Sequence, residues 1–376
     1  MTLFWLISFL KYYIPTVFIL LNLLYKRLSI YHKPLLYKEP ETGKIINVHK
    51  LYEPFRVNDK ISYWKFIFYG MIFLIPKSIF CMITVISLII HLKIFHIFNK
   101  ESDTNINQRN RIKKIIKFWS YLCFTCAMIK IKKKENTKIK VIYRKYLGEN
   151  YDFEDQNYSL IISNHIGFFD VLFVLYLHQP GFIAKKMVKD YPFFGSVAKG
   201  INCLFVDREN EKARKKIMDD IYLRQKNYLE KKSLTPLAIF PEGTTTSNTH
   251  ILKFKKGAFY HLLPIKPQII KIDQNAPVHV SCGVQNIFFH TLKIMDYHFT
   301  EIGYYDLPVI RPTKYMFEQY ANLGKEKWEI FAEVTRNIYC EIGRFQESNY
   351  GFRDVDLYER SVLSGKYDPN QNNINA

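Results

Sequence analysis

The stretch SNHIGFFDVLF, residues 163–173, carries one imidazole and one carboxylate directly after an apolar run. A neutral imidazole can take a proton from a hydroxyl group, while a neighbouring carboxylate fixes its tautomer and stabilises the imidazolium that forms. His165 and Asp170 are therefore candidates for a general base and its partner. On this motif alone, a histidine that caps a helix beside a solvated aspartate explains the same residues.

The spacing of this pair limits the structures that can bring it together. Five residues on a regular helix place two side chains about 140° apart, on different faces. The side chains meet only if His165 lies on the turn before a helix and Asp170 lies one turn into it. Asn164 and Gly167 favour such a turn, so the sequence predicts a strand, a turn and then a helix.

A second motif, FPEGT at residues 240–244, begins where the apolar run PLAIF ends. Glu242, Gly243 and Thr244 offer a carboxylate, main-chain N–H groups and a hydroxyl in a tight loop at a strand end. Three lysines follow in the next segment: Lys253, Lys255 and Lys256. A loop of N–H groups beside such cations is typical of a phosphate site.

Arg208 stands just past a further apolar run, in GINCLFVDRE at residues 200–209. A guanidinium in this position can hold a phosphate through two parallel hydrogen bonds. A surface arginine paired with Asp207 or Glu209 is the alternative, and the sequence leaves both open.

Short apolar runs predict the strands that position these motifs. They are rich in β-branched and aromatic residues: YSLIIS, GFIAK, CLFVD, PLAIF and QIIKI. Segments with helical character separate them, most clearly residues 210–232. This alternation predicts an α/β fold with a mixed central sheet flanked by helices, and such folds place their sites at strand ends.

Two apolar segments lie in the first third of the chain. Residues 3–25 contain one charged residue, Lys11, and have the roughly 20 residues that span a bilayer. A signal peptide is disfavoured because a basic start and a small-residue cleavage site are missing. Residues 66–98 are longer, contain Pro76-Lys77 and have basic residues on both sides. The positive-inside tendency places both flanks in the cytosol, so we expect a re-entrant segment broken at the proline; a buried pair of soluble helices is the alternative.

The chain is therefore expected to have four parts. Residues 1–65 form a transmembrane helix and a basic linker, 66–117 a membrane-embedded segment with a second basic linker, 118–312 the α/β domain, and 313–376 a C-terminal helix with a disordered tail. The 54 Lys and Arg against 34 Asp and Glu give a net charge of +20, which suits nucleic acid, an anionic membrane or a phosphate-bearing substrate. Because the charge is spread along the chain without a recognisable reading module, a nucleic-acid partner is disfavoured.

Cys123 and Cys126 form a C-x-x-C motif inside a helix-like apolar run. A structural zinc site needs four ligands, and the sequence has no second pair of this kind. We therefore expect free thiols in a reducing compartment, no metal site and no cofactor.

Four motifs occur in one order along the chain: NHIGFFD, GINCLFVDR, FPEGT and LPIKP. After an apolar N-terminal region, they resemble the glycerolipid acyltransferase family, which includes 1-acylglycerol-3-phosphate and lysophospholipid acyltransferases. The resemblance covers about residues 60–355. It implies that His165 is the general base and Asp170 its partner. It also implies a site for the acceptor phosphate formed by Arg208, Glu242 and Gly243, with Lys185 near that site; together with the loop hydroxyl of Thr244, these are the predicted substrate-binding residues.

The finer pattern is more similar to enzymes that reacylate lysophosphatidylcholine or lysophosphatidylethanolamine. Many phosphatidate-forming members have an arginine directly after FPEGT, where this chain has Thr245. The resemblance implies acyl-CoA as co-substrate, a lysophospholipid as acceptor, the lipid bilayer as partner, and an endoplasmic reticulum membrane location with the site facing the cytosol. Acylation of 1-acylglycerol-3-phosphate or glycerol-3-phosphate, a transacylase that does not need CoA, and a non-catalytic membrane scaffold are the alternatives. Protein partners are not predicted.

Overall fold

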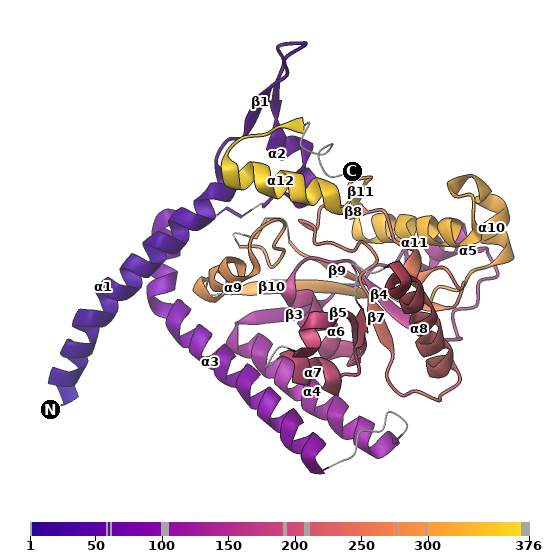
Figure 1. Ribbon diagram of the computed structural model, residues 1–376, viewed down its shortest axis with the longest axis horizontal. Helices are drawn as coiled ribbons and strands as arrows, with labels where there is room; N and C mark the ends of the chain where they lie inside the picture. Colours follow the sequence, from indigo (N-terminus) through magenta and orange to yellow (C-terminus); the bar gives the residue numbers. More distant parts are fainter. Residues whose placement is uncertain are drawn as a thin grey trace.

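A mixed β-sheet forms the centre of the molecule in the computed structural model, which describes residues 2–57, 59–60, 62–98, 105–190, 194–206, 211–273, 275–276, 278–297 and 299–369. Seven strands of the described part pair in the order β3-β10-β9-β4-β7-β5-β6 (Figure 1). They are β3 (Ile129–Lys133), β4 (Leu160–Ser163), β5 (Gly181–Lys185), β6 (Leu204–Val206), β7 (Leu237–Ile239), β9 (Ile265–Lys271) and β10 (Thr300–Asp306). From β9 to β6 all neighbours are parallel, whereas β10 runs antiparallel to β9. The predicted mixed sheet is confirmed.

The five strands predicted from apolar runs are all present, and β3 and β10 are additional. β3 has the sequence IKIKK and lies at the edge of the sheet, parallel to β10. Lysines on an edge strand discourage pairing with a second molecule, but they also dilute the apolar signal by which a strand is recognised. β10 is not among the predicted strands, although its Ile302 is fully buried.

Helices cover both faces of the sheet because strand residues alternate between them. Ile161 of β4 packs on one face with α3 (Tyr63–Phe98), α4 (Ile106–Cys126), α6 (Phe168–His178) and α9 (Ile287–Asp296). Leu160 and Ile162 pack on the opposite face with α5 (Ile139–Leu147) and α11 (Lys327–Gly343). The helix α11 therefore shares a core with the sheet, although the sequence suggested a boundary at residue 312. Further helices are α2 (Val48–Leu51), α7 (Phe194–Gly200), α8 (Glu211–Leu229), α10 (Lys314–Gln319) and α12 (Phe352–Ser364). Four short strands lie outside the central sheet: β1 (Leu36–Lys38), β2 (Ile45–Asn47), β8 (His250–Leu252) and β11 (Gln346–Ser348).

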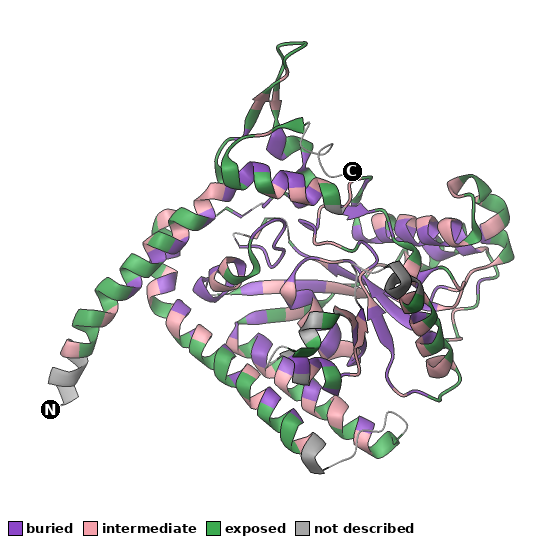
Figure 2. Ribbon diagram, in the orientation of Figure 1, coloured by how far each residue is buried: buried purple, intermediate pink, exposed green. Residues whose placement is uncertain are grey.

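Two helices are long and apolar enough to span a membrane, α1 (Thr2–Ser29) and α3 (Tyr63–Phe98). Only 17% and 28% of their apolar windows are buried, so most of this apolar surface faces outward (Figure 2). The two helices touch where Gly70 of α3 leaves room for Leu21 of α1, because a Cβ on Gly70 would lie 2.2 Å from that side chain.

The expected break of the second apolar segment at Pro76 is wrong, because α3 continues through the proline. The neighbouring Lys77 is buried and donates hydrogen bonds to the main-chain oxygens of Ile294, at 3.2 Å, and Tyr297, at 2.6 Å. These oxygens lie at the C-terminal end of α9 (Ile287–Asp296), where unpaired carbonyls favour a cation. Lys77 therefore anchors α3 to the body of the protein. Beyond α3, the chain returns along α4 (Ile106–Cys126), which carries the thiols of the C-x-x-C motif as free cysteines.

The linker between α1 and α3 is held against α9 by a buried ion pair. Lys293 of α9 lies 2.6 Å from the carboxylate of Asp59, and the two side chains are 0% and 1% exposed. The Lys293 ammonium also donates to Gln285 Oε1 at 2.8 Å, and Asp59 accepts from the His279 N–H at 2.9 Å. The linker is therefore part of the folded body.

Substitution of one partner of this pair is expected to destabilise the protein strongly. Asp59→Asn should lower the free energy of unfolding by about 3–5 kcal/mol, because Lys293 is left buried without its counter-charge. The double variant Asp59→Asn, Lys293→Met should recover much of this loss. Chemical denaturation of the full chain in detergent tests this, with Glu318→Ala as the control, because the exposed Lys314–Glu318 pair contributes at most about 1 kcal/mol. Equal losses in Asp59→Asn and Glu318→Ala would contradict the assignment.

Candidate active site

An asparagine ends strand β4 and directs the chain out of the sheet. The Asn164 side chain accepts from the Ile270 N–H at 2.8 Å and donates to the Ile270 carbonyl at 3.0 Å. The Asn164 side-chain amide thus makes the two hydrogen bonds to β9 that a main-chain residue of β4 would otherwise make. The next residue, His165, leaves the sheet at the carboxyl end of β4, which is where parallel strands place functional groups.

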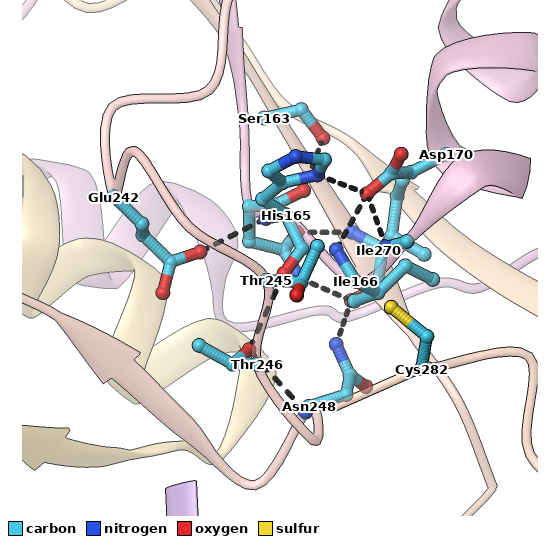
Figure 3. A network of polar contacts seen from close by, with 12 residues as sticks. Ser163, His165, Ile166, Asp170, Glu242, Thr245, Thr246, Asn248, Ile270 and Cys282 are labelled. Carbon is cyan, nitrogen blue, oxygen red and sulfur yellow. Dashed lines mark hydrogen bonds and ion pairs between the residues drawn. The ribbon is translucent and has the colours of Figure 1, made fainter. Parts of the chain in front are cut away.

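Asp170 holds the turn that carries this histidine (Figure 3). It is the third residue of α6 and fully buried. Its Oδ2 accepts hydrogen bonds from His165 Nδ1 at 2.7 Å, from the Gly167 N–H at 3.0 Å and from the Ile166 N–H. The predicted contact between His165 on the turn and Asp170 in the first turn of the helix is confirmed. Because Nδ1 binds the carboxylate, Nε2 is the nitrogen that can face a substrate.

The surroundings of His165 favour its protonated form. Burial by itself lowers the pKa of the imidazole, but the charge of Asp170 and the hydrogen bond to it outweigh burial and raise the pKa above its usual value of 6.5. The side chain is still 23% exposed, so a second molecule can reach the ring. A histidine of this kind can take up and return a proton near neutral pH.

An aromatic wall orients the imidazole from the neighbouring strands. The His165 ring stacks on Phe240 with centroids 4.3 Å apart and planes 17° apart. Phe182 of β5 lies parallel to Phe240 at 6.0 Å. From the sequence, Phe240 was only the last residue of a strand, because nothing in the sequence indicates stacking between residues 75 positions apart. The wall restricts the rotation of the base.

Glu242 lies beneath the histidine turn, which gives it a different role from the expected contact with an acceptor phosphate. One oxygen accepts from the His165 N–H at 2.9 Å and the other from the Leu252 N–H at 3.0 Å. The residue is 2% exposed, and burial raises the pKa of its carboxyl to about 7. Glu242 thus ties the histidine turn to β8, with both oxygens already bound to the main chain.

The other predicted phosphate residues have different positions. Gly243 is exposed on the tight turn after β7, with φ +73° and its N–H bound to the Phe240 carbonyl at 3.1 Å. Thr244 follows it, half-exposed. Lys185 is the last residue of β5, but its side chain lies outside the described part. Arg208 also lies outside the described residues. The structure therefore brings His165, Asp170, Glu242 and Gly243 together and leaves Arg208 untested.

Two further loops support the histidine turn from behind, and the sequence did not indicate them. The Thr246 N–H donates to the His165 carbonyl at 2.9 Å, and the Cys282 N–H donates to the Ile166 carbonyl at 2.8 Å. Thr245 turns inward and donates to the Gly283 carbonyl at 3.1 Å. Burial raises the pKa of the Cys282 thiol to about 11, so this cysteine is not an activated nucleophile.

A histidine in contact with a buried carboxylate, on a turn at the carboxyl end of a parallel strand, is the geometry that the four motifs led us to expect. Residues 129–272 match the family model described as Acyltransferase. This range contains the turn, Asp170 and Glu242, and the resemblance to glycerolipid acyltransferases is confirmed.

Curated relatives match about half of the chain. The lysophospholipid acyltransferase LPEAT1 of Arabidopsis thaliana is 27% identical over 57% of this chain and 52% of its own length. The lysophosphatidylcholine acyltransferase of Drosophila melanogaster is 26% identical over 54% of this chain and 36% of its own length. The match thus spans about half, or less, of these relatives. A solved structure, the 1-acyl-sn-glycerophosphate acyltransferase PlsC of Thermotoga maritima, is 15% identical with a TM-score of 0.48 and covers 74% of this chain and 99% of that one.

Removal of the Glu242 carboxylate is expected to loosen the histidine turn. Glu242→Ala leaves the N–H groups of His165 and Leu252 buried without an acceptor, at a cost of about 1–3 kcal/mol for each. Thermal and chemical unfolding of the full chain measure this loss. The control is Glu135→Ala at an exposed position, for which a change within about 0.5 kcal/mol is expected. A Glu242→Ala variant as stable as the control would contradict the bracing role.

Proposed function

We propose that the protein is a membrane-bound acyltransferase that moves an acyl chain from acyl-CoA to the free glycerol hydroxyl of a lysophospholipid. The observation that carries the proposal is the contact of His165 Nδ1 with the buried Asp170 carboxylate, in a region that matches the Acyltransferase family model. The names of the similar proteins from Arabidopsis thaliana and Drosophila melanogaster support a lysophospholipid as the acceptor.

In the proposed reaction, His165 acts as a general base. Its Nε2 takes the proton of the glycerol hydroxyl while the oxygen attacks the thioester carbonyl, and a tetrahedral intermediate forms. The carbon–sulfur bond then breaks, coenzyme A leaves as a thiolate, and the imidazolium returns the proton to the sulfur. The Asp170 carboxylate stabilises the imidazolium between these two steps. The buried Cys282 thiol takes no part.

The outward apolar surfaces of α1 and α3 support a lipid bilayer as the place where the acceptor is bound. The basic residues in the last turn of α1, Lys26 and Arg27, support a cytosolic position for the active site by the positive-inside tendency. We assign the protein to the endoplasmic reticulum membrane, where coenzyme A esters reach the site from the cytosol. Because the His165 side chain is 23% exposed, both substrates can reach its Nε2.

Loss of the imidazole is expected to abolish acyl transfer. His165→Ala should leave no transfer above background and the same membrane-bound yield, and Asp170→Asn should lower kcat by roughly 10²–10⁴. The assay supplies purified membranes with labelled acyl-CoA and a panel of lysophospholipids, 1-acylglycerol-3-phosphate and glycerol-3-phosphate; omission of acyl-CoA tests for a transacylase. Cys282→Ala serves as the control and should stay active. Transfer by His165→Ala at the wild-type rate would refute the mechanism.

The pH dependence of the reaction should report the raised pKa of His165. The base must be neutral, so kcat/KM should fall as the pH drops through an apparent pKa above 6.5. Asp170→Asn removes the charge that raises the pKa, so this acid limb should move to lower pH in the variant. Rates of transfer measured across pH 5 to 9 test the shift. An acid limb at the same pH in both proteins would argue against the imidazole as the titrating group.

A further inference from the structure

Lysines line one face of the sheet at the edge formed by β3 and β10. In the register of the strands, Lys132 of β3 lies beside Gly303 of β10, and Gly303 lies beside Lys271 of β9. Residues that are paired in this way point to the same face of a sheet. Because the neighbouring Ile302 belongs to the core under α6, the row of Lys132, Gly303 and Lys271 points to the opposite face, which α11 covers.

The small Gly303 allows a third lysine to join this row. A Cβ at Gly303 would overlap Lys134 Cε, and it would lie 3.0 Å from Lys134 Cδ and 2.8 Å from the main-chain oxygen of Lys271. The Lys134 N–H donates to the Tyr304 carbonyl at 2.7 Å, so the main chain at this lysine is fixed to β10. The Lys134 side chain thus lies across the glycine and meets the main chain of Lys271.

The end of α11 adds a guanidinium at the same place. The Lys271 ammonium donates to the main-chain oxygen of Arg344 at 3.4 Å and lies 4.0 Å from the ring centroid of Phe345. These contacts orient the ammonium and use one of its three N–H donors. Burial, and then the charges of Lys134 and Arg344, lower the pKa of Lys271 to about 8. The cations are therefore close enough to repel one another.

The lysines on the other face of the same strands have an acidic partner. There, Lys133 and Lys266 lie 3.6 Å and 2.9 Å from carboxylate oxygens of Asp306. On the face of Gly303, the acidic residue of β10 is Glu301, which lies beside Lys130 in the next row.

We use the name Gly303 cluster for the four cations around this glycine, which are Lys132, Lys134, Lys271 and Arg344. Among the residues that the structure describes, no ion pair includes a member of this cluster. The position of Lys271 at the C-terminal end of α11 accounts for one of the charges and leaves the other three unexplained. Positive charge that is gathered without counter-charges favours an anion.

We propose that the Gly303 cluster binds a phosphate monoester or a diphosphate group. Phosphate oxygens accept strong hydrogen bonds from charged donors, and a guanidinium can donate two of them in parallel. A group with at least two negative charges suits four cations better than the zwitterionic head group of phosphatidylcholine. Two sources carry this chemistry: the head group of a bilayer lipid such as phosphatidate, and a soluble compound with a terminal phosphate or a diphosphate. The cluster contains no residue of the histidine turn or of the FPEGT loop, so the proposal does not depend on the proposed function.

Ligand binding to the full-length protein in a neutral detergent tests the site. Inorganic pyrophosphate is the soluble probe, phosphatidate added to the micelles is the lipid probe, and phosphatidylcholine is the lipid without net charge. At least one of the two probes should raise the Tm of the wild type above its value in sodium chloride of the same ionic strength, and the rise should grow with probe concentration. The probe that acts at the lower concentration identifies the source.

The double variant Lys134→Ala, Arg344→Ala should weaken binding of this probe about tenfold or more, the size expected for loss of charge-assisted hydrogen bonds. Lys133→Ala is the matched control, because it removes the same charge from the same strand on the face where Asp306 is the partner. This control should bind the probe like the wild type. Lys132→Glu, at an exposed position, should weaken binding as well, and it replaces the double variant if that protein does not fold.

Two results would overturn the proposal. One is a wild-type Tm that neither probe raises beyond the effect of sodium chloride, and the other is an equal loss of binding in Lys133→Ala and in the cluster variants. Because the experiment measures binding, a failure to transfer acyl chains would count against the proposed function alone.

Discussion

One carboxylate oxygen, Oδ2 of Asp170, determines how the turn between β4 and α6 is built. It accepts three hydrogen bonds, from the imidazole of His165 and from the N–H groups of Ile166 and Gly167. The same atom therefore fixes the start of the helix and the orientation of the imidazole. Because Asp170 is completely buried, its charge acts on the imidazole through a medium of low polarity, where electrostatic effects are strong.

Hydrogen bonds from several other segments hold this turn in place. Asn164 releases it from the sheet, Glu242 holds its N–H side, and Thr246 and Cys282 bind the carbonyls of His165 and Ile166. These contacts come from segments far apart in the sequence, which converge at the carboxyl ends of β4, β7 and β9. An imidazole whose turn has so many main-chain supports is held in a pre-organised orientation.

Local patterns in the sequence were sufficient to predict five of the seven strands of the described sheet and the position of His165 before the helix, since apolar runs, turn residues and helix geometry act over a few residues. Local patterns did not predict the role of a residue whose hydrogen-bond partners lie far away in the sequence. A break was expected at Pro76-Lys77, but the helix continues and Lys77 is buried. Its partners at the end of α9 lie 217 and 220 residues further along the chain, so local sequence could not reveal them. Likewise, Glu242 was expected to face a phosphate, and only the tertiary structure shows that the main chain uses both of its oxygens.

The linker between α1 and α3 lies against the parts that hold the turn. Pro54 accepts the Ser247 N–H at 2.7 Å, next to the residue that binds the His165 carbonyl, and Asp59 neutralises Lys293. A chain shortened to start after α3 would retain the whole sheet and every residue of the histidine turn. It would nonetheless leave the buried Lys293 ammonium without Asp59, and the loop at Ser247 without its hydrogen bond to the Pro54 carbonyl. The α/β part of this molecule is thus not an independent unit that can be separated from the apolar helices α1 and α3 by a single cut.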